Sequence, residues 1–198
     1  MLDFWKSSER RGGRVGILPA AFNPVTLAHL EMARQGVRQY GLDEVLFLLP
    51  RIFPHKTYTG AGFEQRVEML QAALAGEPQF SIGSTDQGLF LDIARACRPV
   101  YDPGAELFFL CGRDAAERIV HWDYGTGPPF AGQLQEFQML VAPRGGPYAV
   151  PPEYAGRIHL LDLGPEFEQY SSTAAREGVE HFVPLAVARI IRRERLYQ

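Results

Sequence analysis

Residues 14–29, RVGILPAAFNPVTLAH, contain a short apolar run, a turn and the start of a helical pattern. The run at residues 14–18 is typical of a buried strand. Asn23 can cap a helix, and Pro24 fits the first helical position, where its missing N–H costs no hydrogen bond. Apolar residues then recur at helical spacing over residues 27–40. This stretch therefore predicts a strand that leads directly into a helix.

The remainder of the chain repeats this alternation. Apolar runs that predict strands lie at residues 44–49, 80–84, 106–111, 138–142 and 158–163. Helical spacing of apolar residues occurs over residues 63–74, 91–97 and 184–197. Near-continuous apolar strands separated by helices indicate a parallel sheet that is covered on both faces. We therefore predict an α/β fold, a Rossmann-like open parallel sheet with helices on both faces, in a single domain over residues 1–198 with a C-terminal helical segment at 178–198.

Composition limits the function classes. The chain of 198 residues is 46% hydrophobic and 22% charged, which is close to the globular average. Its net charge of −3 gives no general attraction to nucleic acid or to an anionic membrane, so we expect neither as a partner. The sequence has no signal peptide and no apolar run long enough for a membrane span, so we expect a cytoplasmic protein. Cys97 and Cys111 offer no disulfide framework and no zinc spacing, and Cys111 lies in an apolar run typical of a buried thiol.

Ligands of open parallel sheets bind beyond the carboxyl ends of the strands, near the point where the strand order reverses. We expect the loops that follow Leu18, Leu49, Cys111 and Leu163 to meet at such a place. These loops carry most of the polar residues that could perform chemistry.

The first loop ends in a helix start that carries Thr26 and His29. These residues are three apart and share one face of the first turn, where backbone N–H groups and the helix dipole favour an anion. An imidazole there can donate a hydrogen bond to phosphate. The alternative is that Thr26 is only a helix cap and His29 a half-buried surface residue, and these residues alone do not decide between the two.

A second helix start is indicated at residues 170–176, YSSTAAR. Three hydroxyl side chains can cap this helix, and Arg176 follows Thr173 by three positions and Ser172 by four. Its guanidinium can therefore reach an anion held at the helix start. Capping alone also explains the Ser-Ser-Thr run, and on these residues alone it is the simpler interpretation.

Two further loops carry polar residues. The segment at 54–56, PHK, follows the second strand, and the segment at 112–114, GRD, follows the apolar run at 106–111, with Trp122 beyond it. An aromatic side chain near phosphate-binding loops can stack on a planar ring. Separately, Lys56 can be a solvated lysine, Asp114 a helix cap and Trp122 a residue packed on the sheet. Their joint placement at one sheet edge favours a site.

These residues resemble two signatures of nucleotidyltransferases. Residues 22–29, FNPVTLAH, resemble the (His/Thr)-x-Gly-His signature, and residues 171–176, SSTAAR, resemble the Ser-Ser-Thr-x-x-Arg signature. Within that superfamily the chain resembles the bacterial nicotinate mononucleotide adenylyltransferases. The segments that match in order are 54–56 with Arg66, 112–114 with Trp122, 143–146 and 183–197. The resemblance covers nearly the whole chain.

The resemblance implies transfer of the adenylyl group of ATP to the phosphate of nicotinate mononucleotide, with pyrophosphate as the second product. It also implies Mg²⁺, held mainly by the phosphates of ATP. The second pKa of a phosphate monoester is about 6, so the attacking phosphate is largely dianionic at pH 7 and needs no general base. Catalysis then depends on positioning and on neutralising charge.

The resemblance also implies a role for each site residue. His29 and Thr26 would stabilise the α-phosphate during transfer, and Arg176 would hold the departing phosphates, which makes these three the catalytic residues. Asp114 would bind a ribose hydroxyl. The residues implied to bind ATP are Phe22, Asn23, Gly112, Asp114, Ser171, Ser172 and Thr173.

On the mononucleotide side, the resemblance implies Lys56, Leu89 and Trp122. Lys56 would neutralise phosphate charge, and Trp122 would stack on the pyridine ring. ATP and nicotinate mononucleotide are thus the expected partners, and a homo-oligomer is compatible with the sequence.

Two other functions fit the same sequence. Leu89 and Phe90 stand where the family commonly has polar residues, which favours adenylyl transfer to another phosphate monoester. Residues 19–21, PAA, and Ala28 replace small or glycine residues of the family's loop, which favours a nucleotide-binding relative without catalysis. A panel of acceptors separates the first alternative, and ATP binding measured beside turnover separates the second.

Overall fold

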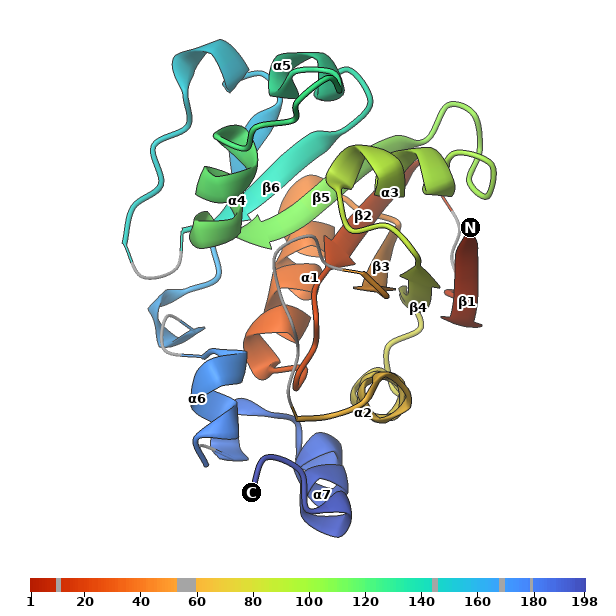
Figure 1. Ribbon diagram of the computed structural model, residues 1–198, viewed down its shortest axis with the longest axis vertical. Coiled ribbons are helices and arrows are strands. Elements are labelled where there is room, and N and C mark those ends of the chain that lie inside the picture. The colour runs from red at the N-terminus through yellow and green to blue at the C-terminus, as the bar shows by residue number, and fades with distance from the viewer. Residues whose placement is uncertain (10–11, 53–59, 144–145, 168–169, 179) are drawn as a thin grey trace.

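The computed structural model describes residues 1–9, 12–52, 60–143, 146–167, 170–178 and 180–198 (Figure 1). Its single sheet consists of β1 (Leu2–Lys6), β2 (Arg14–Pro19), β3 (Glu44–Pro50), β4 (Phe80–Thr85), β5 (Glu106–Gly112), β6 (Gln138–Ala142) and β7 (Ile158–Leu160). The strand order is β1-β4-β3-β2-β5-β6-β7, and β2 to β7 run parallel. This is the strand order of a doubly wound Rossmann sheet, with the reversal between β2 and β5. The predicted fold class is confirmed.

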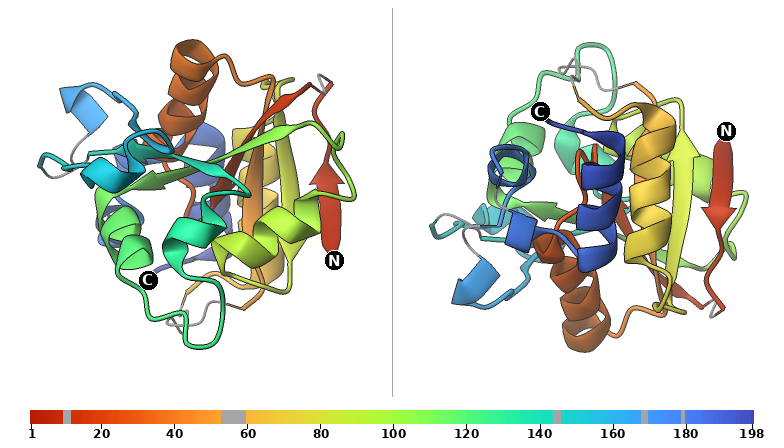
Figure 2. Two further views of the ribbon diagram at one scale, coloured as in Figure 1. Left: turned by 90° about the horizontal axis from the view of Figure 1, so that it is seen from above. Right: turned by 90° about the horizontal axis from the view of Figure 1, so that it is seen from below.

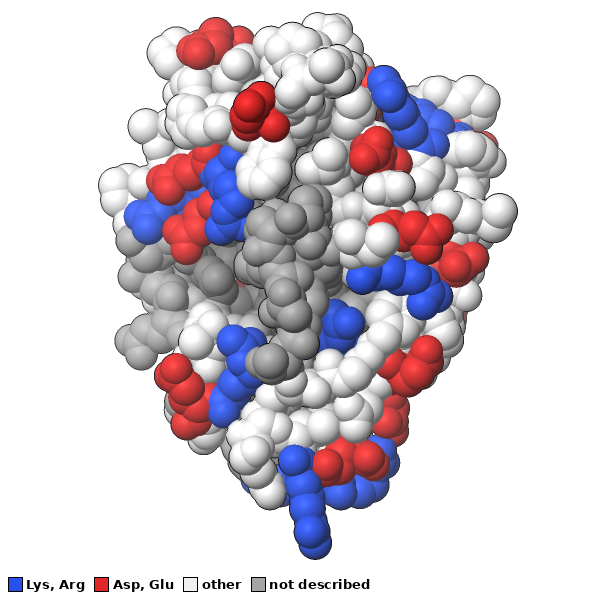
Figure 3. Space-filling view, viewed as in Figure 1, with Lys and Arg blue, Asp and Glu red and all other residues white. Residues whose placement is uncertain are grey.

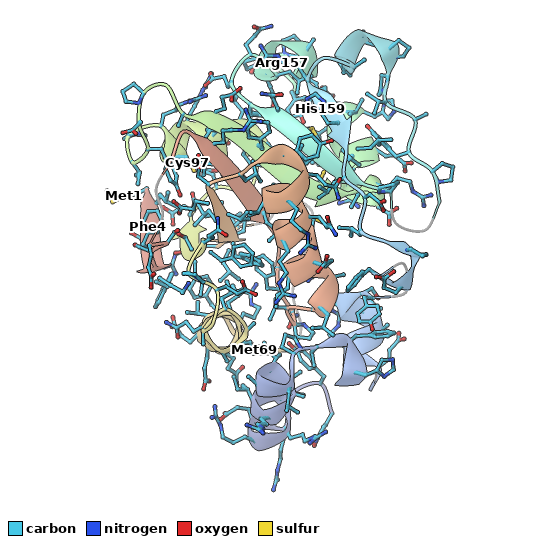
Figure 4. All side chains as sticks on the ribbon, turned by 180° about the vertical axis from the view of Figure 1, so that it is seen from behind. Met1, Phe4, Met69, Cys97, Arg157 and His159 are labelled. Carbon is cyan, nitrogen blue, oxygen red and sulfur yellow. The ribbon has the colours of Figure 1, made fainter. Side chains whose placement is uncertain are left out.

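Strand β1 is the one strand of the described chain that the sequence did not predict. It pairs antiparallel with β4 and forms an edge of the sheet. Figure 4 labels Phe4 on this edge and His159 on β7, at the opposite edge. The strand is short and carries charged residues, so it lacks the continuous apolar run that marks the other strands.

The helices are α1 (Leu27–Tyr40), α2 (Phe63–Ala73), α3 (Phe90–Cys97), α4 (Arg113–Val120), α5 (Phe130–Gln133), α6 (Ser172–Arg176) and α7 (Leu185–Glu194). Short 3-10 turns lie at Pro152–Tyr154, Pro165–Phe167 and Glu180–Phe182. Helices α1, α2, α6 and α7 contribute to the core on one face of the sheet, and α3, α4 and α5 to the core on the other. Figure 2, seen from below, shows α7 beside α2.

Burial on both faces explains why the central strands are almost entirely apolar. In β3, Phe47 and Leu49 point into the core that holds α1 and α2, whereas Leu46 and Leu48 point into the core that holds α3. All four side chains are fully buried. Complete burial of a Leu or Phe side chain stabilises the fold by about 2 kcal/mol, which favours apolar residues on both faces of the central strands.

The start of α1 differs from the prediction. Thr26, not Asn23, is the N-cap, with an extended backbone at φ −120° and ψ 165°, and Pro24 lies before the helix rather than in its first turn. The reason is that the side chain of Asn23 is used elsewhere, because its Oδ1 accepts a hydrogen bond from the hydroxyl of Tyr197 at 2.7 Å. The end of α1 follows the sequence, since Gly41 closes it at a positive φ of 59°.

Other properties follow the composition. Cys97 and Cys111 are both buried free thiols, and burial raises the pKa of each to about 12. The face shown in Figure 3 carries acidic and basic side chains in alternation rather than one large charged patch. Within the described ranges, no helix has the length and apolarity needed to cross a membrane.

Candidate active site

A cleft of about 550 Å³ opens at the carboxyl ends of β2 and β5, where the strand order reverses. Its walls come from the loop after β2, the start of α3, the end of β5 with the start of α4, and the start of α6. The lining residues that matter for chemistry are His29, Leu89, Gly112, Asp114, Trp122, Ser171, Ser172 and Thr173, together with residues 19–21. Ligands of such sheets bind in this crevice.

The cleft brings together most of the loops that the sequence singled out. The loop after Leu18 and the turn after Cys111 line it directly, and the segment after Leu163 reaches it through the start of α6. Lys56 lies outside the described residues, as does most of the loop after Leu49. The two helix starts, α1 and α6, face the same opening.

His29 lies in the first turn of α1 and lines the cleft. Its Nδ1 accepts a hydrogen bond from the backbone N–H of Thr26 at 3.0 Å, and the hydroxyl of Thr26 lies 2.8 Å from the same nitrogen. Because Nδ1 is an acceptor, the neutral imidazole carries its proton on Nε2. The ring of Phe22 packs edge-on against the imidazole, with centroids 5.2 Å apart. His29 is therefore held in one tautomer and one orientation.

Thr26 itself does not line the cleft. Its side chain is fully buried at the start of α1, where it contacts His29. Phe22 and Asn23, in the loop between β2 and α1, are also buried and do not line the cleft. The structure thus places Thr26 as a cap and a support for His29, whereas the sequence predicts that both residues contact phosphate. Spacing shows that two residues share a helix face, but not which of them reaches the cleft.

The start of α6 is joined to the start of α1. Ser171 caps α6, because its Oγ accepts a hydrogen bond from the N–H of Ala174 at 3.0 Å. The hydroxyl of Ser172 donates to the carbonyl of Pro24 at 2.8 Å, across the gap between the two helices. Thr173 is exposed beside them. Ser172 therefore links the two helix starts directly.

Arg176 forms the second link. Its Nη1 donates to the carbonyl oxygen of Asn23 at 2.7 Å, and its Nη2 donates to Oγ1 of Thr173 at 3.1 Å. The cleft walls do not include Arg176, so the structure shows it holding the loop before α1. A guanidinium has five N–H donors, so these contacts leave donors for a phosphate at the same helix start.

Arg66 is a site residue that the sequence did not predict as such. It lies on the buried face of α2, and its Nη1 donates to the carbonyl oxygen of Ala21 at 2.9 Å. Its position on the apolar stripe, between Phe63 and Leu70, is the sequence signal that could have identified it, because a buried arginine needs a hydrogen-bond partner. Arg66 and Arg176 together hold the backbone of the loop at residues 21 and 23.

The opposite end of the cleft is lined by the start of α3, by α4 and by the residues that follow α4. Gly112 is the N-cap of α4, and Asp114 follows in the first turn with 80% of its side chain exposed. Leu89 precedes α3, and Trp122 follows α4, both half-buried. Phe90, which follows Leu89 in the chain, also lines the cleft and stacks on Phe109, with ring centroids 4.2 Å apart. This end offers the carboxylate of Asp114, the guanidinium groups of Arg113 and Arg118, and apolar and aromatic surfaces that suit a planar ring with a sugar.

The described residues of the cleft do not form a metal site of their own. In the part of the chain that the structure describes, no three or more His, Cys, Asp or Glu side chains are grouped so that they could hold a metal ion. A metal in this cleft would therefore be held mainly by a ligand with its own oxygen atoms, and a nucleoside triphosphate meets that requirement.

The fold and the cleft together define a class of protein. Two adjacent helix starts and a histidine with a fixed tautomer lie at the point where the strand order reverses, opposite a cleft end that has aromatic and charged side chains. Such an arrangement binds a phosphorylated nucleotide. The site is thus that of a nucleotide-binding α/β protein.

A family model for cytidylyltransferase-like proteins matches residues 17–178, so the chain belongs to that family. Two relatives are named probable nicotinate-nucleotide adenylyltransferase. The relative from Listeria monocytogenes serovar 1/2a is 31% identical over 193 residues, which cover 93% of this chain and 97% of the relative. The relative from Thermus thermophilus is 31% identical over 198 residues, with 93% and 100% covered. The predicted resemblance is confirmed.

A solved structure supports the fold independently. Nicotinic acid mononucleotide adenylyltransferase from Plasmodium falciparum, complexed with NaAD, is similar to this chain with a TM-score of 0.73. The similarity covers 94% of this chain and 98% of that chain at 17% sequence identity. At such low identity the comparison establishes the shared fold, and the chemistry depends on the site.

Proposed function

We propose that this protein transfers the adenylyl group of ATP to the phosphate of nicotinate mononucleotide, forming nicotinate adenine dinucleotide and pyrophosphate. The observation that carries the proposal is the joined pair of helix starts beside His29, at the place where the strand order reverses. The named relatives, matched over nearly their whole length, support the same reaction.

The reaction joins an oxygen of the mononucleotide phosphate to the α-phosphorus of ATP. The bond from that phosphorus to the bridging oxygen breaks, and pyrophosphate departs with the electron pair. The Nε2–H of His29 donates a hydrogen bond to an α-phosphate oxygen as negative charge accumulates there. The N–H groups at the starts of α1 and α6 favour the triphosphate, and Arg176 assists from the side of α6.

Mg²⁺ fits this site as a companion of ATP. The exposed carboxylate of Asp114 is the one acidic side chain among the described cleft residues, so the triphosphate would supply most of the oxygen ligands. When bound, the ion neutralises phosphate charge. The residues of the chain bind and orient the triphosphate, and His29 stabilises the charge that develops on the α-phosphate.

The far end of the cleft accounts for the second substrate. The indole of Trp122 offers a face for the pyridine ring, and Leu89 provides an apolar wall. Asp114, by contrast, serves the first substrate, because its carboxylate accepts hydrogen bonds from the ribose hydroxyls of ATP. Lys56 remains a proposed phosphate ligand on the mononucleotide side.

The test is turnover of the purified chain with ATP and Mg²⁺. Pyrophosphate release is measured with nicotinate mononucleotide, with nicotinamide mononucleotide and with ribose 5-phosphate as acceptors. We expect release with at least one pyridine mononucleotide and little with ribose 5-phosphate. Equal rates with all three acceptors would indicate that the cleft does not recognise the pyridine ring. The natural acceptor would then be a different phosphate monoester, which is the alternative that the apolar Leu89 favours. ATP binding without pyrophosphate release would indicate a binding protein.

A further inference from the structure

The C-terminal tail folds back onto the site. Helix α7 ends at Glu194, and Arg195 and Tyr197 then adopt left-handed backbone conformations, with φ of 51° and 64°. Leu196 between them is buried. The C-terminus consequently lies between α6 and α7 in Figure 1. These residues fall outside the segment 17–178 that matches the family model.

The hydroxyl of Tyr197 binds the loop before α1. It donates a hydrogen bond to Oδ1 of Asn23 at 2.7 Å, although 174 positions separate the two residues. Burial raises the pKa of Tyr197 above its ordinary value, more than the neighbouring Arg176 and Arg66 lower it. The hydroxyl therefore keeps its proton at neutral pH and remains a donor.

The ring of Tyr197 is fixed as well. Gly60 has a φ of 101°, and a Cβ built on it would lie 2.8 Å from Cε1 of Tyr197. The glycine thus provides the space that the ring occupies. Ring and hydroxyl are both held, so the bond to Asn23 has one geometry.

Asn23 lies in the segment that determines where His29 points. Its neighbour Phe22 packs on the imidazole, and Thr26, three residues later, holds Nδ1. The carbonyl of Asn23 is held by Arg176. Contacts from outside this segment therefore hold it in place, and one of them is the hydrogen bond from Tyr197 to the buried amide side chain of Asn23.

We propose that Tyr197 is a positioning residue, which holds the loop before α1 in the ATP-binding arrangement before ATP arrives. This inference rests on the proposed adenylyl transfer. When a loop is ordered in advance, its ordering cost is not subtracted from the binding free energy of the ligand. Loss of the hydroxyl therefore weakens ATP binding, and once ATP is bound the loop is ordered again.

The test is Tyr197→Phe in the full chain, which removes the hydroxyl and keeps the ring. One hydrogen bond of about 1 kcal/mol corresponds to about a five-fold rise in KM for ATP. We expect kcat and the KM for nicotinate mononucleotide to change by less than about two-fold, because neither depends on the order of the free loop. The Kd of ATP, measured by calorimetry without acceptor, should rise by the same factor.

The matched control is Tyr40→Phe. The hydroxyl of Tyr40 donates to the carbonyl of Leu160 at 2.5 Å, near the β7 edge and outside the cleft. This variant loses one tyrosine hydrogen bond and should keep the wild-type KM and Kd for ATP. In an Asn23→Ala background, Tyr197→Phe should cause no further loss of ATP affinity, because the side chain that accepts the tyrosine hydrogen bond is already absent.

A wild-type Kd for ATP in Tyr197→Phe would overturn the inference, and so would an equal loss of ATP affinity in the presence and absence of Asn23. A fall in kcat with unchanged KM would also overturn it, because that pattern indicates a smaller fraction of folded protein. The ATP measurement needs no acceptor. It therefore decides this inference even if the wild-type chain fails to use nicotinate mononucleotide, which would refute the proposed function alone.

Discussion

The two helix starts at the cleft are held by different means. Helix α1 is 14 residues long, and its start is fixed by packing, with Phe22 and Thr26 buried around His29. Helix α6 is 5 residues long, and its start is fixed by polar contacts that Ser172 and Arg176 make with the loop before α1. The comparison indicates that buried side chains hold the start of α1, whereas α6 depends on the polar contacts that join it to the loop before α1. Variants at the two sites should therefore have different effects.

The largest effect is expected at His29. His29→Ala removes the donor to the α-phosphate and should lower kcat by about a hundred- to a thousand-fold. The free energy of unfolding should fall by only about 1 kcal/mol, because the main loss is the bond to Thr26. Pyrophosphate release and thermal unfolding measure the two quantities. His181→Ala, an exposed histidine outside the cleft, is the control. A lower free energy of unfolding with an unchanged kcat would mean that His29 is structural.

The next effect is expected at Arg176, on the side of α6. Arg176→Met removes the charged hydrogen bonds that join α6 to the loop, and we expect kcat/KM for ATP to fall by about ten- to a hundred-fold. Arg157→Met, at an exposed arginine near β7, should leave kcat/KM unchanged and serves as the control. If Arg176→Met affected only the KM for the mononucleotide, α6 would belong to the other half of the cleft.

The smallest effect is expected at Ser172. Ser172→Ala removes the hydroxyl that donates to Pro24 and keeps the charged link through Arg176. We expect about a five-fold rise in KM for ATP and a loss of about 1 kcal/mol in stability. Ser171→Ala, which removes the cap within α6, is the comparison, because it loosens α6 without breaking the link to α1. An effect of Ser172→Ala as large as that of Arg176→Met would show that both links are needed equally.

The sheet and most helices follow from the sequence, because buried parallel strands such as residues 44–49 are continuous apolar runs and helices such as residues 27–40 have clear periodicity. Strand β1 could not be found this way, because five residues that include Asp3 and Lys6 carry no such run. Its pairing with β4 depends on residues almost eighty positions away.

The location of the site could be predicted from the sequence, whereas several contacts of the site residues could not. The strand ends and signatures place His29 and Ser171 at one opening, as the structure has them. The buried position of Thr26 and the use of Asn23 by Tyr197 depend on contacts between distant parts of the chain. Local spacing contains no information on such contacts, so these assignments required the structure.

The antiparallel pairing of β1 has a consequence for how the protein behaves at high concentration. Without residues 1–6, β4 would present a row of unpaired N–H and C=O groups at the edge of the sheet, which is a template for another chain to add a strand. Because they pair with this edge of β4, the N-terminal residues disfavour self-association through the sheet. Shortened forms of the chain that begin near residue 12 should precipitate more readily while keeping the same catalytic cleft.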